Sequence, residues 1–128
     1  MDIQEIDSSL LASLHAKAED NIRKRINFDL RTTPEDQSQR MLNCLEVGTE
    51  VPVHQHTDTS ETIICLEGRL DVIVYEKSGD DVLPVEKSRI ALCPAEGRYG
   101  VQLPVGAWHS VEVFEPSTIF EAKDGAYK

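Results

Sequence analysis

The spacing of apolar residues changes once along this chain of 128 residues, close to residue 38. Between Leu10 and Ala18, apolar side chains recur at intervals of one, three and four positions, which is the pattern of an amphipathic helix. Asp7 or Ser8 comes just before this run and can accept hydrogen bonds from the free N–H groups of a first helical turn. We therefore predict a helix that ends near Asn21, with its apolar stripe packed on a barrel or on a partner subunit.

The rest of the chain has the pattern of strands and turns. Residues 22–37 are polar and include a breaker at 32–36, so we expect a connector there. Beyond it, short apolar or alternating runs are separated by turns rich in Gly and Pro, which is typical of an all-β sandwich or barrel. The predicted strands are 39–47, 51–56, 61–67, 69–76, 82–86, 88–93, 99–103, 108–114 and 118–123. The prediction is one compact domain, with an N-terminal helix and polar connector at 1–38 and a β-barrel at 39–128.

Two histidines and a carboxylate lie where a predicted strand turns back on itself. Residues i and i+2 of a strand share a face, so His54 and His56 are expected to aim their rings into the same space. A polar turn follows, and the returning strand can bring Glu61 beside them. The tight turn at Pro104–Gly106 opens another strand near His109, a fourth candidate. Imidazoles and a carboxylate that converge on one point are metal-ligand chemistry.

Strand parity also predicts what surrounds these side chains. Cys65 shares a face with Glu61, and Val111 and Val113 share a face with His109. The expected cavity is therefore mostly apolar around a polar metal site. The chain has three cysteines without a paired spacing, which favours buried thiols in a reducing compartment. Cys65 alone has an alternative interpretation, as a thiol that is oxidised or that binds a soft metal.

Two runs of residues resemble a known family. Gly48-x5-His54-x-His56-x4-Glu61-x6-Gly68 resembles the first cupin motif, and Pro104-x-Gly106-x2-His109 resembles the second. Where the second motif usually opens with Gly and closes with Asn, this chain has Arg98 and Val113. The resemblance implies an all-β cupin fold, a double-stranded β-helix or jelly-roll barrel, with a short N-terminal helix. It also implies that the three histidines and Glu61 hold one divalent transition metal, with Zn, Fe, Mn, Ni and Co all open.

A narrower resemblance covers nearly the whole chain. Residues 39–43 and 120–127, together with Arg25-x-Asn27, are similar to the WbuC-type cupins, small metalloproteins named for a place in O-antigen gene clusters. This likeness implies a role in surface-polysaccharide (lipopolysaccharide) synthesis and suggests further pocket residues, each of which is otherwise an ordinary surface or ion-pair residue. The candidates are Arg25, Arg40, Asn43, Tyr99, Glu121, Lys123 and Tyr127. Arg40 and Asn43 lie on opposite strand faces, so at most one of these two faces the cavity.

Charge and hydropathy exclude several classes of function. The net charge of −10 disfavours nucleic-acid binding, which needs clustered cations. No apolar run approaches 18 residues and the N-terminus lacks an apolar signal core, so neither a membrane span nor secretion is predicted and a cytoplasmic location is expected. Residues 21–40 have five cationic and three acidic side chains, a local charge of +2. This basic segment is either an ordinary solvated loop or a contact for an anionic small-molecule ligand.

Three hypotheses of function remain open. The first is a metal-dependent enzyme, resembling an isomerase or epimerase, that acts on a sugar or sugar phosphate. The second is an iron-dependent dioxygenase of a small organic substrate, which the three-His, one-Glu pattern of cupins permits. The third is a non-catalytic cupin that binds a ligand. We expect a homodimer in each case, and fold alone does not choose among the three hypotheses.

Overall fold

A computed structural model describes residues 2–125. Helix α1 spans Ser8–Asp20, and the side chain of its N-cap residue Asp7 accepts a hydrogen bond from the Leu10 N–H at 2.9 Å. The helix ends where the Asn21 N–H donates to the carbonyl oxygen of Ala18. The helix predicted from the sequence is therefore confirmed at both ends.

The other regular elements are strands and one short 3-10 turn. They are β1 (Arg25–Asp29), β2 (Ser38–Leu45), β3 (Glu61–Glu76), β4 (Val85–Leu92), η1 (Pro94–Glu96), β5 (Gly100–Leu103) and β6 (Trp108–Asp124). They form one sheet in the order β1-β2-β6-β3-β4, with β5 paired to β3. The expected all-β architecture with one short N-terminal helix is confirmed.

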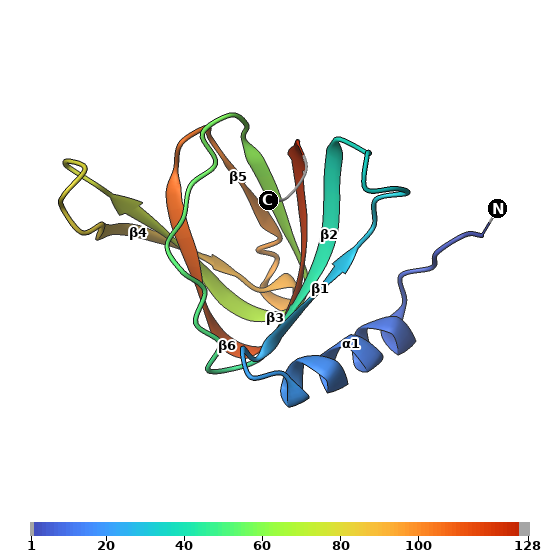
Figure 1. Cartoon of the computed structure of the whole chain (residues 1–128). Helices are drawn as coiled ribbons and strands as arrows, with labels where there is room; N and C mark the ends of the chain where they lie inside the picture. Colours follow the sequence, from blue (N-terminus) through green and yellow to red (C-terminus); the bar gives the residue numbers. More distant parts are fainter. Residues whose placement is uncertain (1, 126–128) are drawn as a thin grey trace.

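The long strands β3 and β6 curve the sheet into a half-open barrel (Figure 1). They pair antiparallel along nearly their whole lengths, and their register shifts between residues 65 and 70 of β3. On one side of these shifts β3 also pairs with β5, and on the other side it pairs with β4. The two continuous strands therefore connect the two halves of the fold, whereas the sequence pattern predicted two strands in place of each. β4 is likewise continuous where two strands were predicted.

Strand β1 was not predicted, because it lies within a polar segment. Its two faces differ: Ile26 and Phe28 pack with the helix cluster, while Arg25 and Asn27 border a cavity. β1 is paired with β2 from Arg25↔Leu45 to Asp29↔Met41. The sequence of β1 does alternate between polar and apolar residues, but the run is short and its charged neighbours led to the prediction of a polar connector. The predicted strand at 51–56 is wrong, since only an isolated bridge at His54 forms there.

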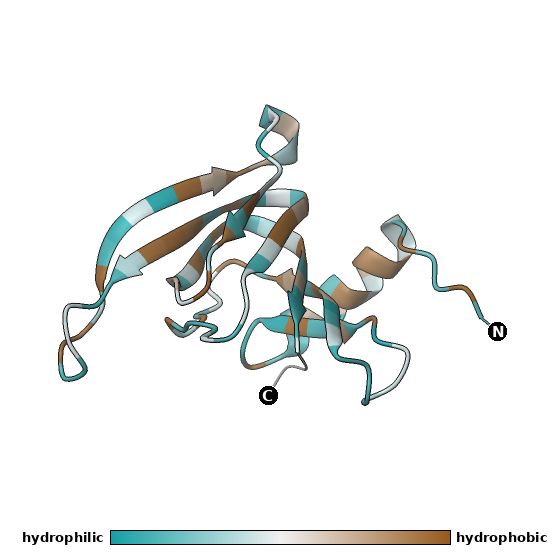
Figure 2. Ribbon diagram, turned by 90° about the horizontal axis from the view of Figure 1, so that it is seen from above, coloured by the Kyte–Doolittle hydropathy of each residue, from teal (hydrophilic) through white to brown (hydrophobic). Residues whose placement is uncertain are grey.

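Two apolar clusters hold the fold together. One lies within the curved sheet and includes Leu45, Ile63, Leu70 and Val72. The other joins the helix to the outer face of β1 and β2, through residues such as Leu14 and Ala18, which are 5% and 0% exposed. Figure 2 shows apolar and polar residues alternating along the strands, as a sheet with two different faces requires. The helix thus covers the outside of the sheet and leaves the concave side open.

Three residues far apart in the sequence fix the helix to the sheet. The His15 ring lies 2.8 Å from a Glu46 oxygen through Nδ1 and 2.9 Å from a Glu67 oxygen through Nε2. Nε2 also lies 2.9 Å from the Thr118 hydroxyl. Both ring nitrogens are thereby occupied by contacts that join the helix to the sheet. Among the described residues, no helix has the length and apolar character needed to span a membrane.

Candidate metal centre and adjoining cavity

Backbone pairing brings His54 against His109. The His54 N–H donates to the His109 carbonyl at 3.0 Å, and the His109 N–H donates to the His54 carbonyl at 2.8 Å. The turn before His109 is secured in the same way, because the Gly106 N–H donates to the His56 carbonyl at 2.8 Å. Gly106 has a φ of +84°, a conformation that glycine adopts without strain. The loop from 51 to 56 is therefore held in place without being a strand.

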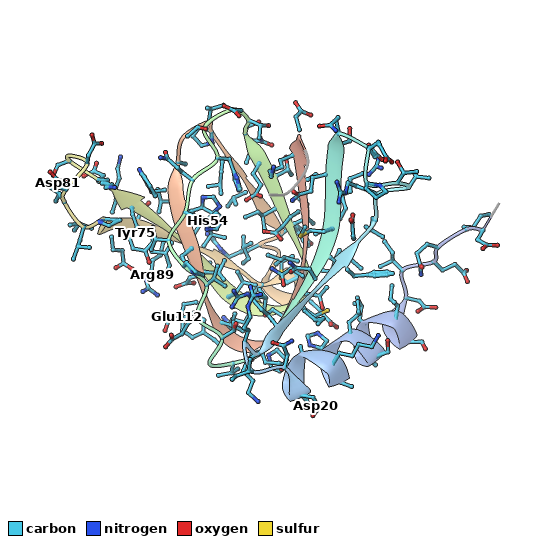
Figure 3. All side chains as sticks on the ribbon, in the orientation of Figure 1. Asp20, His54, Tyr75, Asp81, Arg89 and Glu112 are labelled. Atoms are coloured by element: carbon cyan, nitrogen blue, oxygen red, sulfur yellow. The ribbon has the colours of Figure 1, made fainter. Side chains whose placement is uncertain are left out.

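The three histidine rings form one compact cluster. A ring nitrogen from each of His54, His56 and His109 lies within 4.8 Å of the other two. The ring centroids of His54 and His109 are 4.2 Å apart, and the other two pairs are 5.2 and 5.6 Å apart. His54 lies inside the half-barrel, on the side away from helix α1 (Figure 3). The convergence predicted from the sequence is thus present, and these residues could hold a metal ion.

Short contacts with the backbone set the orientation of two rings. Nδ1 of His54 lies 2.9 Å from the Pro52 carbonyl oxygen, and Nδ1 of His109 lies 2.9 Å from the Ala107 carbonyl oxygen. A carbonyl oxygen only accepts, so each Nδ1 carries a hydrogen. Nε2 of His54 therefore holds the lone pair of the neutral ring, whereas Nε2 of His109 donates to Glu61 when the His109 ring is charged. This arrangement of partners behind the ring is the one that orients histidines in metal sites.

Glu61, the first residue of β3, lies against two of the rings. Its Oε1 is 3.2 Å from His109 Nε2, and its Oε2 is 3.3 Å from His56 Nε2. The His56 contact lacks hydrogen-bond geometry, and that buried Nε2 has no hydrogen-bond partner. Glu61 itself is only 3% exposed. A buried carboxylate next to an unpartnered ring nitrogen fits the chemistry of a metal site.

Burial and charge shift the protonation of these groups in different directions. Burial lowers the pKa of His54 and of His56, so both rings favour the neutral form that binds metals. Burial is also the largest single influence on His109 and lowers its pKa, but the hydrogen bonds with Glu61 and the Ala107 carbonyl and the charges of Glu61 and Glu121 together outweigh it, so the pKa of His109 is raised. Burial favours a neutral Glu61, yet the hydrogen bond with His109 and the nearby His56 hold its pKa below the usual value.

A cavity of about 670 Å³ adjoins the cluster. Its walls are the loop at 51–59, the cavity faces of β1 and β2, and the ends of β3 and β6 nearest to Glu61 and Lys123. Most of these lining residues are polar, so the expectation of a mostly apolar cavity is wrong. Val111 and Val113 pack into the apolar core instead of lining the cavity. The polar wall comes from β1 and β2, whose place in the fold the sequence pattern did not reveal.

The further pocket candidates fall into three groups. Arg25, Asn43, Glu121 and Lys123 line the cavity. Arg40 does not: it forms an ion pair with Asp36 and borders a separate hollow on the opposite sheet face.

The two tyrosines have different outcomes. Tyr99 is 61% exposed and does not line the cavity, because it lies before β5, outside the cavity wall. Tyr127 lies outside the described residues.

Two residues that line the cavity, Asn27 and Gln39, were missed as site candidates. Gln39 has the same strand parity as Met41 and Asn43, and this alternation could have identified it. Asn27 could not be found in that way, because β1 was not recognised. Arg23 also lines the cavity, and it belongs to the basic segment at 21–40, one of whose two interpretations was a contact for an anionic ligand.

Cys65 is a core residue. It lies in the apolar cluster, and its Sγ donates to the Glu67 carbonyl at 3.2 Å. Burial raises the pKa of this thiol to about 11, which keeps it protonated at neutral pH and unreactive. Cys44, Cys65 and Cys93 are all free and buried. The structure thus supports the structural interpretation of Cys65.

Glu121 stands apart from the other carboxylates in the cavity. It lies on β6 between Met41 of β2 and Ile63 of β3, and it is one of the residues that line the cavity. Burial raises its pKa to about 7, and the charge of Glu61 adds to the shift, while a hydrogen bond from Asn43 partly opposes it. A carboxyl that titrates near neutrality can accept or release a proton at physiological pH.

The shifted pKa of Glu121 predicts a pH-dependent effect of Glu121→Gln on stability. The folded protein holds this proton up to about pH 7, while the unfolded chain releases it near the ordinary value of 4.5. Stability due to the protonated carboxyl is therefore full at low pH and is lost as the pH rises through this window. Glutamine avoids the loss, so the gain of the variant over the parent should be larger at about pH 8 than at about pH 5.5, by about 1–2 kcal/mol.

Urea unfolding of chelator-treated protein at the two pH values measures the Glu121 effect. Glu115→Gln is the matched control, because Glu115 is an exposed residue of the same strand. Its effect should be small at both pH values. An equal gain for both variants, or no pH dependence for Glu121→Gln, would contradict the assignment.

Comparisons with known proteins give the fold and the family. The family model described as "Domain of unknown function (DUF6016)" matches residues 6–85. A search of curated protein sequences gave no match.

Similar solved structures include TT1209 from Thermus thermophilus, which is 22% identical with a TM-score of 0.65 over 98% of both chains. A cupin-2 domain containing protein from Shewanella frigidimarina is 22% identical, with a TM-score of 0.52 over 76% of this chain and 79% of that one. An RmlC-like cupin protein from Desulfovibrio desulfuricans is 17% identical, with a TM-score of 0.52 over 78% and 81%. The expected cupin fold is thereby confirmed.

Proposed function

Because this chain belongs to the family described as a domain of unknown function (DUF6016) and has the cupin fold, we propose that it is a metal-dependent enzyme acting on a small polar molecule. The observation that carries the proposal is the cluster of three histidine nitrogens within 4.8 Å, open to a cavity of about 670 Å³. Two of these rings are already oriented by backbone carbonyls. A site organised in this way has little ordering cost left when it binds an ion.

The proposed ligands are His54, His56 and His109, with Glu61 as the fourth. Neutral imidazoles and a carboxylate suit Zn, Fe, Mn, Ni and Co. One carboxylate does not neutralise a divalent ion, so a bound metal would polarise a substrate oxygen or acidify water there.

The proposed reaction is an isomerisation or epimerisation of a sugar or sugar phosphate. Such a reaction needs a side chain that moves a proton, and Glu121 lies in the same cavity with a pKa of about 7. Arg23, Arg25 and Lys123 also line the cavity and would favour an anionic group on the substrate. The resemblance to WbuC-type cupins supports a place in surface-polysaccharide synthesis, as part of this proposal.

An iron-dependent dioxygenase is the second candidate, favoured by the same set of three histidines and one carboxylate. The two reactions differ in what they consume. Proton transfer at a substrate carbon incorporates deuterium from heavy water, whereas a dioxygenase consumes oxygen and requires iron.

The test uses protein purified without chelator, with its metal content measured first. A panel of monosaccharides and sugar phosphates is then followed by NMR in heavy water, beside oxygen uptake. Deuterium incorporation that Glu121→Gln removes while metal content is retained would support the isomerase. Oxygen uptake by the iron form alone would replace it with the dioxygenase. A stoichiometric ligand without turnover would leave a non-catalytic cupin.

The proposal includes a homodimer in a reducing, cytoplasmic environment. The three free, buried cysteines support the reducing environment. Exposed apolar residues at the hairpin before β4, Val82 and Leu83, offer a surface for a second copy. Sedimentation of the parent and of Leu83→Lys tests the dimer. A monomeric parent would contradict this part and leave the metal site unaffected.

A further inference from the structure

Unpartnered polar atoms gather in one place within the described part of the chain. Three buried side-chain atoms have no hydrogen-bond partner: Gln39 Oε1, Asn43 Oδ1 and His56 Nε2. All three residues line the cavity beside the histidine cluster. Most buried polar side-chain atoms in proteins are paired, because an unpaired one costs about 1–3 kcal/mol. His56 Nε2 is accounted for by the proposed metal, but the two amide oxygens are not.

The strand register places these amides on the same wall as Glu61. Gln39 on β2 pairs with Lys123 on β6, which in turn pairs with Glu61 on β3. Residues paired across neighbouring strands share a face, so Gln39 lies two strands from Glu61, at a backbone separation of about 10 Å. Gln39 lines the cavity and is 3% exposed, and its Oε1 is buried without a hydrogen-bond partner.

The chemistry of the wall limits its ligand. The two unpaired oxygens, Gln39 Oε1 and Asn43 Oδ1, are both hydrogen-bond acceptors, so a matching ligand has to supply hydrogen-bond donors. The cavity is lined both by cations (Arg23, Arg25 and Lys123) and by carboxylates (Asp58, Glu61, Glu121 and Asp124), so charge alone does not select the ligand. An apolar ligand would leave both oxygens unpaired. Hydroxyl groups supply the donors that the two oxygens need and, unlike an ammonium group, can also accept hydrogen bonds from the cations of the wall.

We infer that Gln39 and Asn43 form a hydroxyl-recognition subsite next to the histidine cluster, and that its ligand is a polyhydroxylated small molecule. The inference deepens the proposed function and rests on it only for the place of the reacting end of the ligand. The two amides select the substrate by pairing with its hydroxyl groups. A site built to pair with a hydroxyl strongly rejects an analogue that lacks it.

Substitution of a polar side chain that serves ligand binding should raise the stability of the unliganded protein, whereas substitution of one that serves stability should lower it. Gln39→Met preserves the side-chain volume and removes an unpaired buried acceptor, so the melting temperature of the unliganded protein should rise by about 2–4 °C. Gln102→Met is the matched control. Its Oε1 accepts a hydrogen bond from the Thr62 hydroxyl on the exposed surface and is not part of the cavity.

Binding is measured with glucose and myo-inositol as probes, and with cyclohexanol as the probe that has a single hydroxyl. The readout is the side-chain amide signals of Gln39 and Asn43 in ¹⁵N-labelled protein, titrated to about 100 mM both with metal and after chelation. We expect both polyols to shift these signals and cyclohexanol to bind at least tenfold more weakly. Gln39→Met and Asn43→Leu should each weaken polyol binding at least tenfold, whereas Gln102→Met should leave it unchanged.

Each result separates this subsite from the metal centre. A lower melting temperature for Gln39→Met, unchanged polyol affinity in both variants, or no polyol binding to the parent would overturn the inference. Polyol binding to a protein that takes up no metal would reject the proposed metal chemistry and leave the subsite standing. Metal uptake without any polyol binding would do the reverse.

Discussion

Replacing His54 or His56 by alanine should reduce the bound metal from about one equivalent to less than about a tenth. Each substitution removes one of the three nitrogens that lie within 4.8 Å of one another. Loss of a residue that only supports a ligand already costs 10–100-fold in metal affinity, so loss of a ligand itself should cost more than about 100-fold. Glu61→Gln keeps the size of the side chain and tests the fourth ligand, with an expected weakening of at least about tenfold.

Elemental analysis and metal titration measure this loss. A second readout is thermal: metal in 1,000-fold excess over its dissociation constant stabilises the parent by about 4 kcal/mol, and this shift should vanish in the alanine variants. His15→Gln is the control, because it removes the one histidine outside the cluster, whose ring nitrogens contact Glu46 and Glu67. Alanine variants that keep a full equivalent of metal would place the ion elsewhere.

Gly68→Ala should be among the most destabilising single substitutions in the protein, at about 4 kcal/mol or more. Gly68 has a φ of +100°, and a methyl group there would lie 2.3 Å from Ser117 Oγ, 2.5 Å from the Pro116 oxygen and 2.6 Å from Ser117 Cα. Two of these atoms belong to the backbone of β6 and cannot move aside cheaply. The residue sits where the register of β3 on β6 shifts, so the strain falls on the two strands that connect the halves of the fold.

Two other glycines separate the causes of this effect. Gly48 also has a positive φ, of +94°, but a methyl group there meets nothing within 4 Å, so Gly48→Ala should cost only about 1–2 kcal/mol for its conformation. At Gly79 the nearest atom is Val82 Cγ2 at 3.6 Å, an ordinary contact, and Gly79→Ala should be close to neutral. Urea unfolding of the three variants measures their free energies of unfolding and so ranks the three costs. A cost for Gly68→Ala no greater than that for Gly48→Ala would show that β6 yields to the methyl group.

These glycines explain why a spacing motif predicted so much of the site. Gly48 and Gly68 bound the run that contains His54, His56 and Glu61, and each has a backbone conformation that other residues rarely adopt. Such residues mark turns and close approaches, which are local events that a sequence can encode directly. His109 follows Gly106 for the same reason. The helix could be predicted for a similar reason, since its periodicity and its Asp7 cap lie within one short segment.

The polar character of the cavity could not be predicted from short segments of the sequence. Its polar wall depends on β1 pairing with β2, on β2 pairing with β6, and on the register that aligns Gln39 with Lys123 and Glu61. A shift of one residue in any pairing would turn the other face of that strand inward. The same dependence explains Arg40 and Tyr99, which the structure places outside the cavity.

The sequence by itself therefore determined the helix, the all-β class and the three histidines that converge with Glu61. Each of these follows from spacing within a short segment and from turns whose positive φ glycine adopts without strain. Only the tertiary structure decided that β3 and β6 run unbroken, that β1 joins the sheet, and that the cavity is polar with two unpaired amide oxygens. Those features arise from pairing between strands distant in the chain, where side-chain environment depends on register and not on neighbours in sequence.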